Sequence, residues 1–530
     1  MTKALVAEKR KKNRRELDPE HPENQWMPIP SLFLYGLQHV LTMYGGIIAV
    51  PIIMGNAAGL KPAQIGLLIA ACLFIGGIAT LIQTIGWPFF GSKLPLVQGV
   101  SFAAVSTMLA IIGQGHGING LQIVFGSVMV AAVFGLIIAP FFALIVRFFP
   151  PVVTGTVITV IGLSLIPVAI GWIVGNDPKA PGYADPAGIG LAALTLAIIV
   201  VLSKVKNATV SRLSILFSLI IGTVIAALFG KADFSQVTNG PIAGFPNPFE
   251  FGLPQFQIAP IISMMIVILV IMTETTADII AIGEVVGTRV DSKRIAAGLR
   301  ADMLSSAISP FFNSFSQSAF AQNVGLVAIT KIKSRWVVAA GGVVLLVLGL
   351  FPILGRLVAS IPGPVLGGAG IVLFGSVAAS GIRTLGRVDY RNNMNLIIVA
   401  ISVSIGVLPE LNGAIYSHFP SWFQVIFNSG ISSATIAAVL LNLVFNVWKR
   451  GTPKNPSVFA ASPTRGIPIH LVEVLQDGDR IEKGKVFDKD DHELPLVDAE
   501  GHVVDQLFND EPEEVVTTSE KKHKVGDSAG

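Results

Sequence analysis

The stretch that decides the fold is AFAQNVGLVAITK, which runs from Ala319 to Lys331. Two side-chain amides, Gln322 and Asn323, stand side by side, and Gly325 follows two residues later. Apolar stretches flank this run on both sides, yet its own apolar part is shorter than the roughly 20 residues that span a membrane. The stretch therefore predicts a short or broken segment that carries polar groups into an apolar chain.

The composition of the whole chain predicts an integral membrane protein. Its 530 residues are 52% hydrophobic and 13% charged, and the mean hydropathy is +0.69. Soluble domains carry about 25% charged residues. The single cysteine, Cys72, lies in an apolar run and excludes a disulfide framework. No apolar core precedes residue 28, so the N-terminal stretch does not read as a cleaved secretory signal.

Charge divides the chain into a basic body and an acidic tail. Residues 1–450 hold 28 Lys and Arg against 16 Asp and Glu, whereas residues 451–530 hold 9 against 17. These balances of +12 and −8 give the formal net charge of +4. We expect a basic cytoplasmic N-terminus over 1–27, a transmembrane body over 28–450 and an acidic cytoplasmic tail over 451–530. The middle of the tail could form small strands, and its end has the composition of a disordered segment.

Hydropathy predicts an all-α polytopic body of fourteen transmembrane segments. With odd-to-even loops taken as external, the even-to-odd loops carry fourteen basic residues and the odd-to-even loops carry four. This bias follows the positive-inside rule and places both termini in the cytoplasm. The predicted spans are 31–54, 63–87, 98–112, 121–145, 151–173, 188–203, 211–229, 259–283, 293–309, 322–332, 335–354, 362–381, 392–409 and 431–448.

The third and tenth spans are short, and they resemble each other at an offset of 224 residues. VQGVSFAAV (97–105) then falls on AQNVGLVAI (321–329), with Gln98 opposite Gln322. Three identities in nine could be chance. The offset, however, also carries the third span onto the tenth, seven spans later. A repeat of an odd number of spans must have the opposite orientation in the membrane, so the two halves would be inverted repeats. Paired broken segments point to a transporter's binding site. Half-helices that start near Ser101 and Gln322 would direct free N–H groups into a polar cavity that suits a flat, amide-rich ligand.

The carboxylates inside predicted spans converge on the second half of the body. Glu274 and Asp278 share one helix face at i, i+4 spacing, and Asp302 follows in the ninth span. Such groups are costly in a membrane and usually functional. Simpler interpretations stay open: Asp302 could pair with Arg300 or cap a loop, and Glu274 could only hydrogen-bond a neighbouring helix. His39, the one histidine inside a predicted span, could be either a packing residue or a ligand contact.

These residues resemble the nucleobase–ascorbate transporter family, also called nucleobase:cation symporters. The family signature is Gln/Glu/Pro-Asn-x-Gly, four residues, then Thr-Arg/Lys/Gly, and it is met by Gln322, Asn323, Gly325, Thr330 and Lys331. GLQHVLTMYGG, LPLVQGVSF, ETTADIIAIGEV and GLRADMLSS also resemble family segments in the expected order, over roughly residues 28–450. One departure is the lack of the Thr-Phe-Pro commonly found before the signature.

The resemblance implies a fold and a site. It implies two inverted repeats of seven spans, with short strands and half-helices in spans 3 and 10. It also implies a core of spans 1–4 and 8–11, a gate of spans 5–7 and 12–14, elevator-like core movement and a homodimer. The substrate-binding residues would be Glu274, Gln322, Phe102, Ser101, Asn323 and Gly325, and the residues for proton coupling and turnover would be Asp302, Asp278 and His39.

The sequence thus predicts a proton-coupled symporter that imports purine nucleobases, xanthine or uric acid, across the plasma membrane. At the position of Gln322, a glutamine is typical of the purine carriers of the family that the chain resembles, whereas uracil carriers tend to have a glutamate. A planar amide can pair with the alternating donors and acceptors of xanthine, and a carboxylate accepts from ring N–H groups. We expect no metal, no cofactor beyond the coupling proton, no nucleic-acid partner and no enzymatic activity. A sulfate-like or bicarbonate-like anion carrier is the rival class, but three carboxylates would repel its substrate.

Overall fold

The computed structural model describes residues 21–448, except 116, 143–145, 176–177, 181 and 391–392, and short stretches between 467 and 517. The predictions for residues 1–20 and for most of the tail lie outside these described residues. The chain divides into two compact units, one of Met1–Asp389 with Met394–Thr452 and one of Tyr390–Asn393 with Pro453–Gly530.

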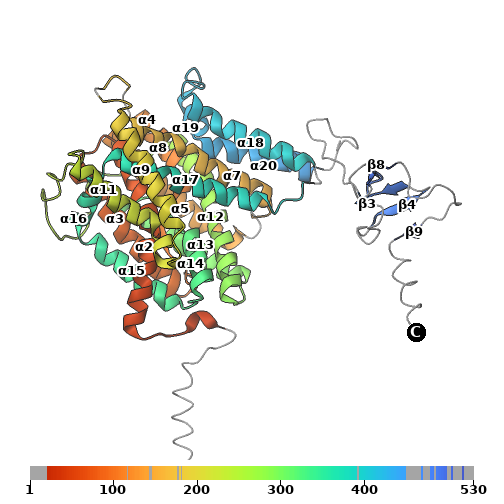
Figure 1. Ribbon diagram of the computed structural model, residues 1–530, viewed down its shortest axis with the longest axis horizontal. Coiled ribbons are helices and arrows are strands. Elements are labelled where there is room, and N and C mark those ends of the chain that lie inside the picture. The colour runs from red at the N-terminus through yellow and green to blue at the C-terminus, as the bar shows by residue number, and fades with distance from the viewer. Residues whose placement is uncertain are drawn as a thin grey trace, which may run out of the picture. The chain divides into compact units, whose positions relative to one another are not determined.

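The first unit is built from helices that are long and apolar enough to cross a membrane (Figure 1). Within the described residues there are nine of them, or ten if the bent pair Arg335–Gly349 and Pro352–Ala359 is one span. Shorter apolar helices cover Phe102–Gln114, Ser214–Leu228 and Ala321–Thr330. The prediction of a helical, multi-pass membrane protein is therefore confirmed. Each of the fourteen predicted segments coincides with a helix, a helix pair or a strand and its following helix.

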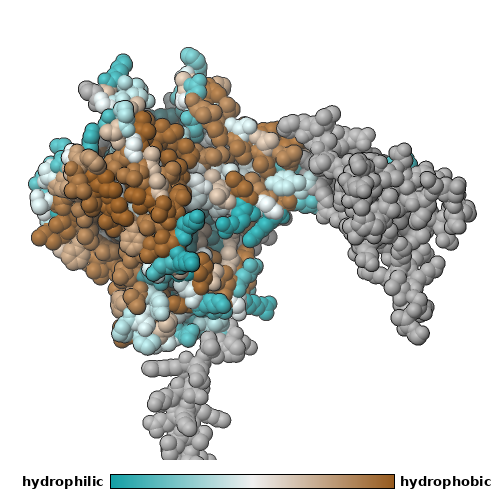
Figure 2. Space-filling view, viewed as in Figure 1, coloured by the Kyte–Doolittle hydropathy of each residue, from teal (hydrophilic) through white to brown (hydrophobic). Residues whose placement is uncertain are grey.

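The surface of this unit fits a lipid environment. Figure 2 shows hydrophobic residues over the middle of the visible face, with hydrophilic residues gathered toward its upper and lower ends. On α11 (Ser214–Leu228), for example, Ile220, Val224 and Leu228 are 52%, 54% and 81% exposed. Exposed apolar area of this extent is unfavourable in water and favourable against acyl chains.

The first half of the unit contains two long helices, a broken third segment and a series of shorter helices. Pro62, Pro151 and Pro186 open helices at a position where the missing N–H costs nothing. In order, the elements are α2 (Ile29–Ala57), α3 (Pro62–Ile85), β1 (Gln98–Val100), η2 (Phe102–Ala104), α4 (Val105–Gly115), α5 (Ile118–Ile138), η3 (Ala139–Phe141), η4 (Val146–Phe148), α7 (Pro151–Ser164), α8 (Ile166–Val174), α9 (Pro186–Ser203), α10 (Ala208–Arg212) and α11.

The second half repeats this order of elements. Two long helices again precede a strand and a short helix. Its elements are α12 (Ile258–Val286), α13 (Ser292–Ile308), η5 (Ser309–Phe312), β2 (Gln317–Ala319), α14 (Ala321–Thr330), α15 (Arg335–Gly349), α16 (Pro352–Ala359), α17 (Gly363–Leu385), α18 (Asn393–Leu411), α19 (Ser421–Phe427), α20 (Gly430–Asn442) and the π-helical turn η6 (Leu443–Val447).

One predicted span is bent rather than straight. The segment predicted over 335–354 is not one straight helix, because α15 ends at Gly349 and α16 leaves it at 80°. Pro352 begins α16 and has no N–H with which to continue the hydrogen-bond ladder of α15. The bend turns the chain at Phe351, so the eleventh segment is shorter than its apolar run.

The third and tenth segments contain the predicted short strands and half-helices. β1 and β2 pair antiparallel, with Gln98 opposite Ala319, Gly99 opposite Ser318 and Val100 opposite Gln317. The residue-level alignment at 224 is wrong, however. Gln98 lies in a strand, whereas Gln322 lies in the first turn of α14. The equivalent strands begin at Gln98 and Gln317, so the offset between them is 219 residues. It differs from 224 because the connections between elements differ in length in the two halves.

The helices pack in two groups. In the first group α15 packs against α2 and α3, α16 against α3, and α5 against α12 and α13. In the second group α17 packs against α7, α8 and α9, α20 against α7, and α11 against α9. Glycines permit the closest approaches: a Cβ on Gly77 of α3 would lie 2.6 Å from the backbone nitrogen of Leu346 on α15. Figure 1 shows α2, α3 and α15 side by side.

The long connection between α11 and α12 is fastened to the first group. Arg356 of α16 is 2% exposed, and its guanidinium donates to the carbonyl oxygens of Val237, Gly240 and Pro241 at 2.9, 3.3 and 2.9 Å. The Gln122 amide of α5 donates to the Phe251 carbonyl oxygen at 2.9 Å. These bonds satisfy a buried cation and loop carbonyls together.

The second unit is a small β structure in its described parts. Two sheets occur, one with the strand order β3-β7-β8 and one with the order β6-β5-β4-β9. The expectation of small strands in the middle of the tail agrees with these elements. Their bounds are β3 (Ile467–Pro468), β4 (Arg480–Glu482), β5 (Lys485–Phe487), β6 (Glu493–Leu494), β7 (Leu496–Val497), β8 (Val503–Val504) and β9 (Val516–Thr517).

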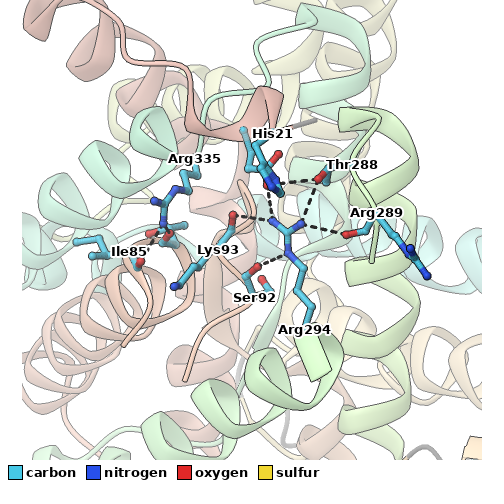
Figure 3. Close-up of polar contacts among 10 residues, drawn as sticks. His21, Ile85, Ser92, Lys93, Thr288, Arg289, Arg294 and Arg335 are labelled. Carbon is cyan, nitrogen blue, oxygen red and sulfur yellow. Dashed lines mark hydrogen bonds and ion pairs between the residues drawn. The ribbon is translucent and has the colours of Figure 1, made fainter. Parts of the chain in front are cut away.

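A polar cluster around Arg294 ties the segment before α2 to the first group (Figure 3). Glu23, in the 3-10 turn η1 (Pro22–Asn24), is 2% exposed and pairs with Arg294 of α13 at 2.7 Å. The Arg294 guanidinium also donates to the carbonyl oxygens of Ser92 and Lys93 at 2.7 and 3.2 Å. One arginine thus joins the first described residues, the connection after α3 and the start of α13.

The same cluster contains further contacts that hold Glu23. Thr288 Oγ1 donates to Glu23 Oε1 at 3.3 Å, and His21 Nδ1 lies 3.3 Å from the same oxygen. Burial alone would raise the pKa of Glu23, but the hydrogen bond from Arg294 and the other contacts outweigh burial and hold the pKa below its ordinary value of 4.5. Glu23 therefore stabilises the fold in its ionised form.

We expect Glu23→Gln to lower the free energy of unfolding by about 1.5–3 kcal/mol, the usual contribution of a hydrogen bond to a charged group. Because the folded-state pKa is lowered, this stabilisation is present above the unfolded-state value and is lost as pH falls through the folded value. The difference in melting temperature between the native protein and the variant should therefore shrink below about pH 4.5. Glu250→Gln, at an exposed carboxylate bonded to Asn247, is the control. Equal melting of the native protein and Glu23→Gln at neutral pH would contradict the assignment.

Candidate functional site

The β1–β2 pair positions the two half-helices in the interior of the first unit. The pairing continues beyond the strands, since Ser101 N–H donates to the Ser316 carbonyl at 2.9 Å and Phe320 N–H donates to the Val97 carbonyl at 3.1 Å. Thr80 Oγ1 of α3 accepts from Gln98 N–H at 2.9 Å. The chain enters η2 and α4 at one end of the pair and α14 at the other, so both helix N-termini begin at the strand pair.

Ser101 and Phe102 form the junction of β1 with its half-helix. Ser101 is buried, and its Oγ accepts from Ala103 N–H at 3.2 Å, which caps η2. Phe102 is partly buried, with its ring centroid 6.3 Å from Phe320 and 6.1 Å from Phe374 of α17. Phe374 in turn lies 6.1 Å from Trp172 of α8. Of the two junction aromatics, Phe102 thus meets an aromatic of the second helix group, and Phe320 packs against Phe102.

Gln322 and Gly325 lie on the open side of α14. The Gln322 side chain is exposed and makes no hydrogen bond to the described residues, so its planar amide is free to bind a ligand. A Cβ built on Gly325 would meet nothing within 4 Å. This face of the half-helix therefore opens onto space, and its first turn offers N–H groups there.

Asn323 points to the opposite side and is committed to His39. It is fully buried, and its Nδ2 lies 3.0 Å from His39 Nδ1 and 3.2 Å from the His39 carbonyl oxygen. Only an N–H group can donate to that carbonyl, so the amide nitrogen faces His39 and Nδ1 is the acceptor. In the neutral imidazole the proton then lies on Nε2. The structure therefore joins two of the predicted residues and makes His39 the partner of Asn323.

Three carboxylates lie near one another on α12 and α13. Glu274 is partly buried, and Asp278, one turn later on the same helix, is 8% exposed. Asp302 of α13 is fully buried. α12 and α13 pack against each other, which brings the three carboxyl groups into one region of the unit. Within the described residues no lysine or arginine forms an ion pair with any of them.

The contacts of Asp302 and Glu274 bear on the simpler interpretations. Arg300 Nε donates to the Ala296 carbonyl at 3.1 Å and does not pair with Asp302. Instead, Thr275 Oγ1 donates to Asp302 Oδ2 at 2.7 Å, while Oδ1 is buried without a partner. Glu274 has no hydrogen bond to a neighbouring helix in the part of the chain that is described. Its carboxylate is therefore free for a ligand, a proton or water.

The predicted residues thus lie on elements that contact one another. α12 packs against α14, β2 and η2, and α14 packs against α2, which carries His39. Sequence reasoning missed Thr275, the donor to Asp302, and the aromatics Phe320 and Phe374. Thr275 directly follows Glu274, but nothing in a single sequence indicates that its hydroxyl faces another helix. The aromatics lie in apolar runs, where packing is the usual role of a phenylalanine.

This arrangement has the features of a carrier rather than a catalyst. Broken helices, a free amide and uncompensated carboxylates lie inside a helical membrane unit, which is the architecture of secondary transporters. The chain is a multi-pass membrane transporter and not an enzyme. The Permease family matches residues 30–411, and the chain belongs to this family, the nucleobase–ascorbate transporters.

Characterised relatives cover nearly all of this region. The chain is 40% identical over 420 residues to the uric acid transporter UacT of Escherichia coli, which covers 79% of this chain and 86% of that protein. It is 40% identical over 415 residues to a xanthine permease of Bacillus subtilis, covering 78% and 94%. It is 38% identical over 420 residues to the uric acid permease PucJ of Bacillus subtilis, covering 78% and 93%.

Solved structures of similar fold come from anion carriers. The transmembrane domain of the cyanobacterial bicarbonate transporter BicA matches with a TM-score of 0.50 and 19% identity, covering 78% of this chain and 97% of that one. SLC26A9 matches with a TM-score of 0.53 and 15% identity, covering 79% and 66%. At this identity the likeness shows the fold alone.

We expect Asn323→Asp to destabilise the protein. The change replaces the donating amide nitrogen with an acceptor that faces two acceptors of His39, so two buried hydrogen bonds are lost, at a cost of about 1–3 kcal/mol. The measurement is the melting temperature of the purified protein. Gln322→Glu makes the same chemical change at the neighbouring exposed amide and should leave that temperature unchanged. Equal melting of both variants would rule out the His39 contact.

Proposed function

We propose that this protein imports purine nucleobases, namely xanthine or uric acid, by proton symport across the plasma membrane. The observation that carries the proposal is that α12 and α14 pack together and present two uncommitted groups, the Glu274 carboxylate and the Gln322 amide. The names of the relatives, xanthine and uric acid permeases, support this substrate class.

The chemistry of a purine-dione fits these groups. A ring edge with alternating N–H and C=O groups can form two hydrogen bonds with the planar amide of Gln322. Glu274 would accept from a ring N–H in a charge-assisted bond. Phe102 lies beside this region and offers a face for ring stacking. Ser101 and Gly325 would shape the two helix starts so that the flat substrate can approach the backbone.

Proton coupling is proposed from the carboxylates. Glu274, Asp278 and Asp302 lie near one another without a cation partner in the described part of the chain, and ionising all three in a membrane interior is costly. A proton shared among them lowers this cost, and urate, an anion, would bind beside a neutral carboxyl more favourably. His39 would act through Asn323, by fixing the orientation of α14.

The transport movement is proposed to be elevator-like. The order of elements from α2 to α11 recurs from α12 to α20, and the β1–β2 pair is antiparallel, both of which support two inverted repeats of seven spans. The first helix group then corresponds to the core and the second to the gate. The loop charges support cytoplasmic termini. A homodimer is expected from the family.

The test is uptake of labelled xanthine by cells that express the protein. We expect accumulation that a protonophore abolishes, and competition by unlabelled urate and xanthine rather than by uracil. The rival class, an anion carrier of the bicarbonate or sulfate type, predicts competition by those anions and none by purines. Uptake equal to that of cells lacking the protein, for every purine tested, would refute the substrate class.

The contribution of Glu274 is measured with Glu274→Gln. This change keeps the shape and removes the charge, so loss of a charge-assisted bond of about 1.5–3 kcal/mol should weaken xanthine binding roughly ten- to hundredfold. Binding and melting temperature are measured on the same purified protein. Because a buried charge disappears, melting should stay at or above that of the native protein. Glu284→Gln, at an exposed carboxyl on the same helix, is the control, and native affinity in Glu274→Gln would exclude the role.

A further inference from the structure

A buried polar cluster joins the core to the gate, and it contains none of the residues of the proposed substrate site. The core contributes Ser106 and Thr107 of α4 and Ser263 of α12. The gate contributes Glu410 of α18 and the start of α20. α4 packs against both α19 and α20, and α12 packs against them as well. We call this set the hydroxyl cluster; its members are Ser106, Thr107, Ser263, Glu410, Ser429, Gly430 and Ser432.

Ser106 forms the first link of the cluster. Gly430 N–H donates to Ser106 Oγ at 3.2 Å, and Ser106 Oγ donates to Glu410 Oε1 at 2.9 Å. A backbone N–H can only donate, so the serine accepts from the gate backbone and gives its own proton to the gate carboxylate. Both partners of this core serine therefore lie on the gate.

The remaining hydroxyls form a second link. Thr107 Oγ1 lies 2.6 Å from Ser429 Oγ and 3.3 Å from Ser432 Oγ. Ser263 Oγ lies 3.3 Å from Ser432 Oγ. Thr107, Ser263, Ser429 and Ser432 are all fully buried. If α4 and α12 moved relative to α20, these hydroxyls would lose their partners and would need water in exchange.

We propose that the hydroxyl cluster is a latch that holds the core against the gate in this conformation and opens in every transport cycle. This proposal rests on the proposed core movement. Glu410 is then a positioning residue for transport, on the gate and separate from the three carboxylates of α12 and α13. With the proposed orientation, α4 runs from the strand pair toward the external side, so a closed latch seals the outer half of the boundary.

The chemistry of the cluster suits repeated opening. A hydroxyl both donates and accepts, so serine and threonine can exchange each other for water at small net cost. The short side chains also allow α4 to slide past α20 without a large steric barrier. A static contact would be served equally well by apolar packing, which costs no desolvation of polar groups.

The test is a reversible cross-link with Thr107→Cys and Ser429→Cys in one chain. Their side-chain oxygens are 2.6 Å apart, so the two thiols can form a disulfide, and the native Cys72 is buried. The control is Ser203→Cys with Ser214→Cys, whose oxygens are 3.1 Å apart and which both lie within the gate. Oxidation should stop xanthine uptake in the first pair, reduction should restore it, and the control pair should transport in both states.

The outcomes separate failure of the latch from failure of the proposed substrate. Cross-linked Thr107/Ser429 protein that still transports would overturn the proposal, and so would failure of the disulfide to form. Absence of uptake in the native protein would instead refute the proposed substrate. If the reduced double-cysteine protein does not transport, the latch is tested instead by the rate at which a membrane-impermeant maleimide labels the single variant Thr107→Cys from outside the cell. Glu410→Ala should accelerate that labelling, and an unchanged rate would overturn the latch.

Discussion

The strand pair of β1 and β2 is the contact on which the rest of the structure depends. A membrane interior offers no water to backbone N–H and C=O groups, so a chain that leaves the helical conformation there must find other partners. Three ladder pairs, the flanking bonds at Ser101 and Phe320, and the Thr80 hydroxyl supply them. Each strand can therefore end inside the unit and start a half-helix there, which ordinary spanning helices cannot do.

The half-helix starts determine what the site can bind. α14 directs the amide of Asn323 inward to His39 and leaves the amide of the preceding residue, Gln322, on its open face. The first fixes the helix and the second is free for a ligand. The carboxylates of α12 and α13 follow the same division, because Asp302 is bonded to Thr275 whereas Glu274 has no protein partner in the described structure. A group that holds the fold thus stands beside one that is available for substrate or proton.

The sequence predicted the segments and the broken pair because apolar length and polar interruptions are properties of the chain itself. It predicted Glu274, Gln322 and Asn323 as site candidates for the same reason. It did not separate the bonded residues from the free ones, since the Asn323–His39 contact joins residues 284 positions apart. The offset of 224 aligned a strand with a helix, because similarity among small apolar residues is insensitive to backbone conformation. The sequence also did not indicate Glu410 as an intramembrane carboxylate, because the predicted thirteenth span (392–409) ended one residue before it.

The kinds of contact inside and between the two groups differ, and this difference bears on movement. In the first helix group, Arg294 with Glu23 and Arg356 with loop carbonyls are buried, charge-assisted contacts. In the second helix group, Lys231 after α11 pairs with Asp185, the N-cap of α9, at the surface. Across the boundary, the polar contacts named above run through serine and threonine hydroxyls, one of which donates to the Glu410 carboxylate, and the rest of the meeting surface includes the aromatic contact of Phe102 with Phe374. Neutral hydroxyls and aromatic faces can exchange partners far more readily than a buried ion pair can, because separating an ion pair leaves an uncompensated charge. The contacts across the boundary between the two groups are therefore the ones that can exchange partners most readily.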